Sequence, residues 1–204
     1  MRTLLTLLHL GCQGSEASPP TTLAAPPQAG EAAAVFAGGC FWCMEGPFES
    51  LKGVVSVESG YTGGPEKQPA YMMVAKGKTG HVEAVRVVYR PDEVSYAELL
   101  NTFWHNIDPT QDDGQFCDKG QQYRSAVFVG SDEERTLAEQ SRDAAGKRLG
   151  RTIVTQVLPG QDFWLAEEYH QDFYKKNPRR YRSYRAGCGR DHRLQQLWGR
   201  DAGH

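Results

Sequence analysis

The chain has 204 residues, of which 39% are hydrophobic and 24% charged. That is enough apolar material for one globular domain and leaves no surplus for a second. With 23 basic and 25 acidic residues the formal net charge is -2, so there is no electrostatic reason to expect nucleic acid or an anionic surface as a partner. Binding partners must therefore be inferred from the residues of a functional site.

The chain starts with MRTLLTLLHLGC. The apolar run from Leu4 to Leu10 is too short to span a bilayer and is also short for a secretory signal. Its ending, LHLGC, resembles the bacterial lipoprotein signal, in which Cys12 would carry the lipid. Residues 1–12 therefore suggest an exported, periplasmic or outer-membrane lipoprotein. A cytoplasmic protein with a disordered N-terminal tail is the alternative.

Residues 13–34 are rich in Ser, Ala, Pro, Gly and Gln and contain almost no large apolar side chain. Such a stretch buries too little surface to offset the entropy lost on ordering. We expect a disordered tether over 13–34 and one folded domain over 35–200.

The domain opens with a short apolar run, 34–37, that ends at a glycine pair. This predicts a buried strand followed by a tight turn. Apolar residues over 41–51 recur at spacings of three and four, as in an amphipathic helix, but Gly46 and Pro47 should loosen its first two turns. The Gly- and Pro-rich stretch 58–80 predicts a long surface loop.

The remaining elements alternate in type. The patterns predict strands over 81–89, 123–129 and 152–158, and helices over 96–104, 132–149 and 162–176. The tail, residues 185–199, shows little periodicity. This alternation favours an α/β or α+β fold with a mixed sheet.

Cys40 lies where the glycine turn leads into a helix. Unpaired N–H groups and the helix dipole there should lower the pKa of its thiol and favour the nucleophilic thiolate. Cys43 follows three residues later, the spacing of thiol–disulfide exchange, although helical geometry keeps the two Cβ atoms too far apart for an undistorted disulfide. Cys43 is therefore either a resolving thiol or a core residue.

Two more cysteines lie in the second half of the chain. Cys188 stands between Gly187 and Gly189 in the weakly patterned tail, and a thiol on a freely moving segment could visit another cysteine. Cys117 is next to Asp118, whose charge would raise its pKa, so we interpret Cys117 as structural.

Glu83 is the candidate acid. It shares one face of the strand 81–89 with apolar and aromatic side chains, and desolvation there would raise its pKa to the range of a general acid. Taken alone, an exposed carboxylate at a strand end is the simpler interpretation. Three loop phenols, Tyr61, Tyr71 and Tyr123, could donate hydrogen bonds to an oxygen or simply pack.

Segments spread over residues 35–200 resemble the A-type peptide methionine sulfoxide reductases. They are GCFWCME (39–45), GYTGG (60–64), AYMMVAKGKTGHVEAV (70–85), GQFCDKGQQYRSAVF (114–128), FWLAEEYHQDFY (163–174) and CGRDHRLQQLWG (188–199). The resemblance implies a two-layer α/β fold with a small mixed sheet, surrounding helices and a long C-terminal coil. The chain would be a monomer.

The resemblance also implies a reaction. Cys40 would attack the sulfur of a methionine S-sulfoxide, free or in a protein, while Glu83 protonates the oxygen. The resulting Cys40 sulfenic acid would condense with Cys188, with Cys43 as the competing resolving thiol. An external thioredoxin-like dithiol would restore the thiols, and no bound cofactor or metal is implied. The residues that would bind substrate are Phe41, Trp42, Tyr71, Asp118 and Tyr123.

Two other functions fit part of the pattern. The segment CFWC between a strand and a helix also suits a thioredoxin-like disulfide oxidoreductase. A zinc module could use Cys40, Cys43 and Cys188 with His170 or His192. It lacks a second CxxC pair, which makes it the weaker alternative.

Overall fold

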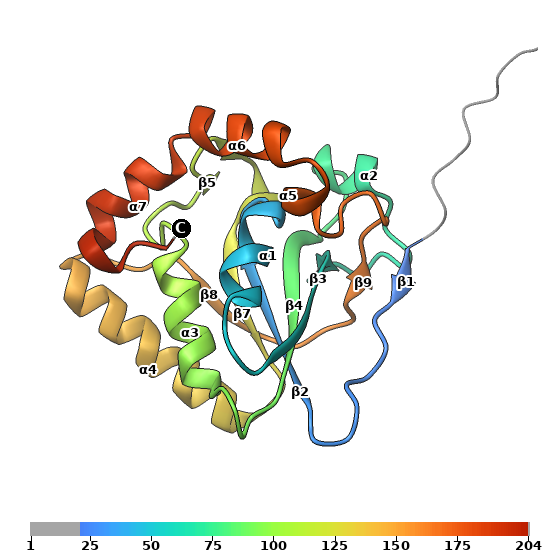
Figure 1. The fold of residues 1–204 in the computed structure, drawn as a ribbon, viewed down its shortest axis with the longest axis horizontal. Helices are drawn as coiled ribbons and strands as arrows, with labels where there is room; N and C mark the ends of the chain where they lie inside the picture. The colour runs from blue at the N-terminus through green and yellow to red at the C-terminus, as the bar shows by residue number, and fades with distance from the viewer. Residues whose placement is uncertain (1–20, 204) are drawn as a thin grey trace, which may run out of the picture.

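A seven-stranded sheet runs through the middle of the computed structural model, which describes residues 21–203 (Figure 1). Its strand order is β1-β9-β3-β4-β2-β7-β8. Neighbouring strands are antiparallel except β7 and β8, which confirms the expected mixed sheet. The strands are β1 Thr22–Leu23, β2 Ala32–Gly38, β3 Val54–Thr62, β4 Val82–Tyr89, β7 Ser125–Val129, β8 Gln156–Pro159 and β9 Trp164–Leu165.

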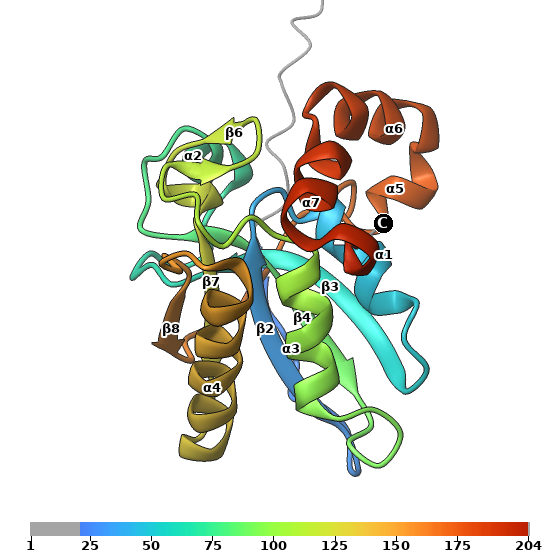
Figure 2. The same cartoon turned by 90° about the vertical axis from the view of Figure 1, so that its left-hand side faces the viewer.

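Helices pack on this sheet, and α3 and α4 lie side by side (Figures 1 and 2). Helices α5, α6 and α7 gather at the end of the molecule where α1 begins. A separate two-stranded sheet holds β5 Gly114–Gln115 and β6 Asp118–Lys119. The helices are α1 Trp42–Glu49, α2 Tyr71–Ala75, α3 Tyr96–His105, η1 Gln121–Tyr123, α4 Asp132–Leu149, α5 Phe173–Lys176, α6 Pro178–Gly187, α7 Arg190–Trp198 and η2 Gly199–Asp201. None of the helices in this part of the chain is long and apolar enough to cross a membrane.

Alternation along the central strands divides the core in two. Phe36 of β2 faces the helices, and its ring stacks on Phe48 of α1 at 5.0 Å and on Phe103 of α3 at 5.2 Å between centroids. Ala37 faces the opposite side, where a smaller cluster packs around Phe163. Burial of both faces explains why β2 is apolar along its length, whereas β4 also carries the buried Glu83 and Arg86.

The sheet register brings the end of β2 next to the start of β4. Phe36 pairs with Val85, and on the other side of β4 Tyr61 pairs with Glu83. The chain therefore leaves β2 beside Glu83. A Cβ on Gly38 would lie 2.6 Å from the sulfur of Met44, so a larger residue there would have to displace the Met44 side chain.

The C-terminal segment is helical, so the expected long coil is wrong. Helices α6 and α7 cover residues 178–198, and Leu194 and Trp198 are buried in the main core. The buried residue that begins α7 is an arginine, Arg190, which donates to the carbonyls of Gly38 (3.2 Å) and Asn106 (2.7 Å). A helix with a charged residue on its inner face shows only a weak hydrophobic period, so the sequence pattern does not indicate this helix.

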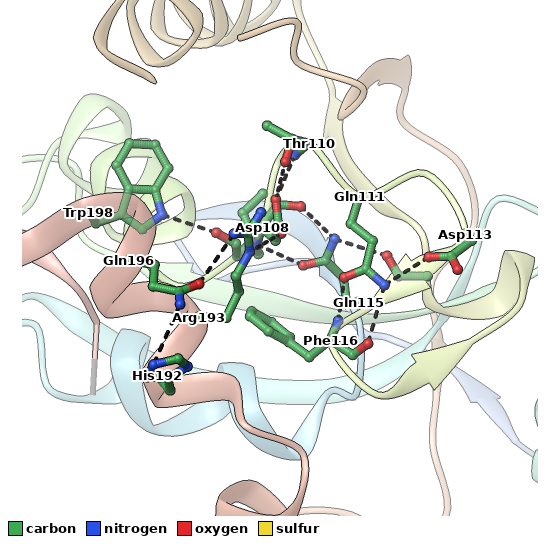
Figure 3. A network of polar contacts seen from close by, with 12 residues as sticks. Asp108, Thr110, Gln111, Asp113, Gln115, Phe116, His192, Arg193, Gln196 and Trp198 are labelled. Atoms are coloured by element: carbon green, nitrogen blue, oxygen red, sulfur yellow. Dashed lines mark hydrogen bonds and ion pairs between the residues drawn. The ribbon is translucent and has the colours of Figure 1, made fainter. Parts of the chain in front are cut away.

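A polar network joins α7 to the loop after α3 (Figure 3). Arg193 donates to the Asp108 carboxylate at 2.7 Å, and Trp198 Nε1 donates to the carbonyl of Ile107 at 3.1 Å. The side chain of Gln115 bonds both backbone groups of Asp108, at 2.8 and 2.9 Å. These bonds hold the acidic loop and the C-terminal helices as one assembly.

The expected tether, 13–34, is wrong for the part that the structure describes. Thr22 pairs with Leu165 in the sheet, and Thr21 donates to the carbonyl of Pro69 at 3.0 Å. Arg86 donates to the carbonyl of Ala25 at 2.7 Å. Hydrogen bonds to backbone groups therefore order the described part of this segment, which has few apolar side chains. Strand β2 already begins at Ala32. Residues 13–20 and the segment 1–12 with Cys12 lie outside the described residues.

Two local predictions also differ from the structure. The helix expected over 162–176 is reduced to α5, because Trp164 pairs with Tyr61 in the sheet and Asp172 has a positive φ of 54°. Conversely α1 is continuous through Pro47. Pro47 has no N–H to donate to the carbonyl of Cys43, four residues earlier, so α1 continues without that one hydrogen bond.

Candidate active site

Cys40 lies in the turn between β2 and α1, buried to 7% exposure. Its neighbour Phe41 is the N-cap of α1 and donates its backbone N–H to Glu83 Oε2 at 3.2 Å. The thiols of Cys40 and Cys43 are hydrogen-bonded to each other. The turn therefore brings one carboxyl group and two thiols together.

The expected low pKa of Cys40 is wrong for this resting state. Burial, the hydrogen bond with Cys43, and the nearby charges of Cys43 and Glu83 raise the pKa of the Cys40 thiol. Proximity to a helix N-terminus does not outweigh the loss of solvent around the sulfur. Cys40 is therefore a thiol when no substrate is bound.

The negative charge of the pair resides on Cys43. The hydrogen bond from Cys40 lowers the pKa of Cys43 to about 6 despite burial, and the guanidinium groups of Arg190 and Arg185 act in the same direction. Both arginines are buried and come from the C-terminal helices. Cys43 is thus more than a core residue.

Glu83 has the properties expected of a general acid. It is 2% exposed, and burial raises its pKa to about 8 although the N–H of Phe41 opposes the shift. Strand alternation predicts that Glu83 shares its face with apolar residues. Val85 and Val87, the next two residues on that face, lie in the main core cluster. At neutral pH its carboxyl group therefore keeps its proton.

Aromatic rings surround the turn on one side. Trp42 stacks face to face on Phe173 at 3.7 Å between centroids, and its Nε1 donates to His170 Nδ1 at 3.1 Å. Phe41 contacts His170 at 5.0 Å between centroids and Tyr61 at 6.0 Å. These contacts fix both aromatic side chains that precede Cys43.

Two of the predicted phenols, Tyr71 and Tyr123, lie near Glu83 and Cys40. Burial, followed by the charges of Glu83 and Cys40, raises the pKa of Tyr71 to about 12. The same influences raise the pKa of Tyr123 further, which shows that both phenols stay protonated and can donate hydrogen bonds. Tyr61 instead donates to Glu167 at 2.8 Å and is a structural residue.

Asp118 belongs to β6 and contacts helix α6. Its carboxylate accepts a hydrogen bond from the phenol of Tyr184, and burial raises its pKa. The ring of Tyr184 meets Trp42 edge to face at 5.9 Å between centroids.

Cys188 is bonded to Cys117 rather than to either thiol of the turn. The disulfide links the acidic loop to the end of α6, and Cys117 is exposed. The structural interpretation of Cys117 therefore overlooked a partner 71 residues away. A zinc set with Cys40, Cys43 and Cys188 is not assembled, because the Cys188 sulfur is already committed.

Sequence reasoning assigned no role to Tyr184, Arg185 or Arg190, and it named His170 only as a zinc ligand. His170 lies within the quoted segment FWLAEEYHQDFY, so its position was signalled although its bond to Trp42 was not. Tyr184 and Arg190 stand among exposed arginines without periodicity, and only the packed tail shows that they face the thiols.

Comparison with known proteins identifies the family. A family model described as peptide methionine sulfoxide reductase matches residues 32–202. The chain is 52% identical over 200 residues to the peptide methionine sulfoxide reductase MsrA 2 of Caulobacter vibrioides, covering 98% of this chain and all of that protein. It is 49% identical over 173 residues to MsrA of Bacillus licheniformis, covering 82% and 93%.

Solved structures of methionine sulfoxide reductases have the same fold as this chain. Reduced Mxr1 from Saccharomyces cerevisiae superposes with a TM-score of 0.71 at 31% identity, covering 76% of this chain and 90% of that one. Methionine sulfoxide reductase A of Corynebacterium diphtheriae gives 0.68 at 30% identity, with 80% and 87% covered. The match spans the whole fold and all the segments that carry the site. The chain belongs to the A-type peptide methionine sulfoxide reductases.

Proposed function

We propose that Cys40 is the nucleophile and Glu83 the acid in the reduction of the S epimer of methionine sulfoxide, free or in proteins. The observation that carries this is the bond from Phe41 N–H to Glu83, which places a protonated carboxyl one residue from the reacting thiol. Attack of the Cys40 thiolate on the sulfoxide sulfur, with one proton from Glu83 to the oxygen, yields methionine and a Cys40 sulfenic acid.

The surrounding groups suit the parts of the substrate. Phe41 and Trp42, held by the contacts with Phe173 and His170, offer apolar faces to the S-methyl group. Tyr71 and Tyr123 donate to the sulfoxide oxygen. Asp118 positions the substrate through water.

We infer that Cys43 resolves the sulfenic acid first, ahead of Cys188. Three observations support Cys43: its sulfur is already hydrogen-bonded to Cys40, its pKa is lowered to about 6, and Cys188 is occupied by Cys117. Because α1 begins only at Trp42, Cys40 is not bound to the helical spacing that would prevent an i,i+3 disulfide. Cys188 takes part only in a later thiol–disulfide exchange.

A thioredoxin-like dithiol completes the cycle in this proposal. Mxr1 from Saccharomyces cerevisiae has been solved in complex with Trx2. Cys43 is only 1% exposed, so a protein reductant cannot reach it directly, whereas Cys117 is at the surface. The Cys117–Cys188 pair is the part of the chain that such a partner can reduce.

The reaction itself is tested with the separated R and S epimers of a blocked methionine sulfoxide and dithiothreitol. The wild-type chain should reduce only the S epimer, and Cys40→Ser should abolish turnover because the attacking sulfur is gone. Cys12→Ser, the same chemical change outside the catalytic domain, should keep the wild-type rate. Reduction of the R epimer, or residual turnover by Cys40→Ser, would overturn the assignment.

Glu83→Gln tests the acid. We expect kcat/KM at pH 7 to fall by about 10² to 10⁴-fold, the usual contribution of a general acid. Since the pKa of Glu83 is about 8, wild-type kcat/KM should decline as pH rises through about 8, and the variant should lack this decline. The exposed Glu133→Gln should follow the wild-type profile. A high-pH decline that survives in Glu83→Gln would assign it to another group.

The resolving step is tested by one turnover of the fully reduced chain with a single equivalent of sulfoxide, followed by mass mapping. Cys188→Ser should still form the Cys40–Cys43 disulfide. Cys43→Ser should accumulate a Cys40 sulfenic acid that dimedone traps. The reverse result, a trapped sulfenic acid in Cys188→Ser and a rapid Cys40–Cys188 bond in Cys43→Ser, would restore Cys188 as the first resolving thiol.

For localisation we propose export with a lipid on Cys12, supported only by LHLGC and by the small-residue stretch that follows it. Expression of the full chain in a Gram-negative host should give a membrane-associated protein that lacks residues 1–11 and carries added mass on Cys12. Cys12→Ser should remain unprocessed. An uncleaved, soluble wild-type protein would favour the cytoplasmic alternative.

A further inference from the structure

Helices α5 and α6 carry a local concentration of positive charge. Residues 173–190 contain no acidic side chain, although the formal net charge of the whole chain is -2. A concentration of charge on a surface attracts a ligand of opposite sign. Five basic side chains in this stretch are exposed: Lys175, Lys176, Arg179, Arg180 and Arg182.

The two lysines are already paired within the fold. Lys175 binds the carboxylates of Glu49 and Asp172, at 2.6 and 2.8 Å, and Lys176 binds a third carboxylate at 2.7 Å. The three arginines, in contrast, make no ion pair within residues 21–203. The unpaired charge of this surface therefore lies on the arginines.

Arg180 is the arginine that contacts the site. Its guanidinium carbon lies over the ring of Phe173, 5.6 Å from the centroid, and Phe173 stacks on Trp42 at 3.7 Å. Arg180 also precedes Tyr184 by four residues, so both lie on the side of α6 that meets Trp42. The other two arginines are one and two positions away along the helix and do not share this side.

The carboxylates that border the site have other partners. Asp118 accepts a hydrogen bond from Tyr184. Glu167 accepts from the phenol of Tyr61 at 2.8 Å and from the backbone N–H of Tyr71 at 3.0 Å. The guanidinium of Arg180 is therefore left to bind a carboxylate that comes from outside the chain.

We propose that Arg180 binds a carboxylate of the substrate, so that the enzyme prefers a methionine sulfoxide that has an acidic group close to it. A guanidinium is a planar fork that fits a carboxylate with two parallel hydrogen bonds, and a ring against its face leaves the N–H groups at its edge available. The inference rests on the proposed role of Trp42 and Cys40 and adds a substrate preference to it.

The reach of the substrate agrees with this placement. Only the Phe173 ring separates Arg180 from Trp42, against which the S-methyl group packs in the proposed function. Consecutive Cα atoms are about 3.8 Å apart, so the residue next to the methionine sulfoxide passes over the same surface. The carboxylate is then either an acidic side chain next to the sulfoxide in a protein or the α-carboxylate of the free amino acid.

Two sets of substrates separate these sources, with dithiothreitol as reductant. The first set is blocked tetrapeptides in which Glu, Gln or Lys follows the methionine S-sulfoxide. The second is N-acetylmethionine S-sulfoxide with a free α-carboxylate and the same compound as its methylamide. Wild type should show a higher kcat/KM for the Glu peptide than for the Gln peptide, for the free carboxylate than for the methylamide, or for both.

Arg180→Gln should abolish this preference. We expect kcat/KM for the preferred substrate to fall by about fivefold, the upper end for an exposed ion pair, through KM rather than kcat. Uncharged substrates should be reduced at the wild-type rate. Arg180→Lys, which keeps the charge but loses the fork, should keep part of the preference, and salt should weaken it in wild type.

Matched controls remove the same charge elsewhere on the helix. Arg179→Gln and Arg182→Gln should keep the preference of wild type. Equal kcat/KM for charged and uncharged substrates in wild type, or an equal loss in all three glutamine variants, would overturn the proposal.

Binding of the same substrates to the Cys40→Ser chain, measured by calorimetry, tests the preference without turnover. A chain that reduces none of the substrates would refute the proposed function. The difference in Kd between the Glu and Gln peptides, and between the free carboxylate and the methylamide, would still decide the role of Arg180. Equal Kd values within both pairs would refute it.

Discussion

The site depends on one buried cation. Arg190 is 1% exposed and donates to the carbonyls of Gly38 and Asn106, while its guanidinium lies 4.4 Å from the centroid of Phe116. These partners belong to the turn before Cys40, the end of α3 and the acidic loop. Burying a guanidinium is costly unless its donors are used. The two bonds from Nη2 and the contact with the Phe116 ring join these three segments, although the buried Nε of Arg190 has no hydrogen-bond partner. The same charge lowers the pKa of Cys43.

The chemistry follows from a division of protons among groups in one small space. Glu83 is kept protonated by burial, whereas Cys43 is kept ionised by its neighbours. An acid that holds its proton and a thiol that has lost one coexist at the same pH only because their environments shift the two pKa values past each other.

The four cysteines of the described residues form two pairs with different exposure. Cys40 and Cys43 are free and buried, and Cys117 and Cys188 form a disulfide at the surface. A buried pair protects a sulfenic acid from overoxidation, but a protein reductant needs an accessible sulfur. The tail that contains Cys188 also contains Tyr181 and Tyr184, so the segment that offers the disulfide also provides the phenols around the thiols.

The sequence by itself determined most of the central strands and helices and indicated Cys40 and Glu83 as the candidate reacting residues. Alternation placed Glu83 on a strand face with apolar side chains, and the glycine pair predicted the turn at Cys40. Only the tertiary structure decided the disulfide partner of Cys188, the helical tail, the ordering of residues 21–34 and the pKa of Cys40. Each of these depends on contacts between distant segments: a sulfur 71 residues away, a buried arginine, a strand pair with β9, and the removal of water from a thiol. Periodicity records which face of an element is buried, but not which partner covers it.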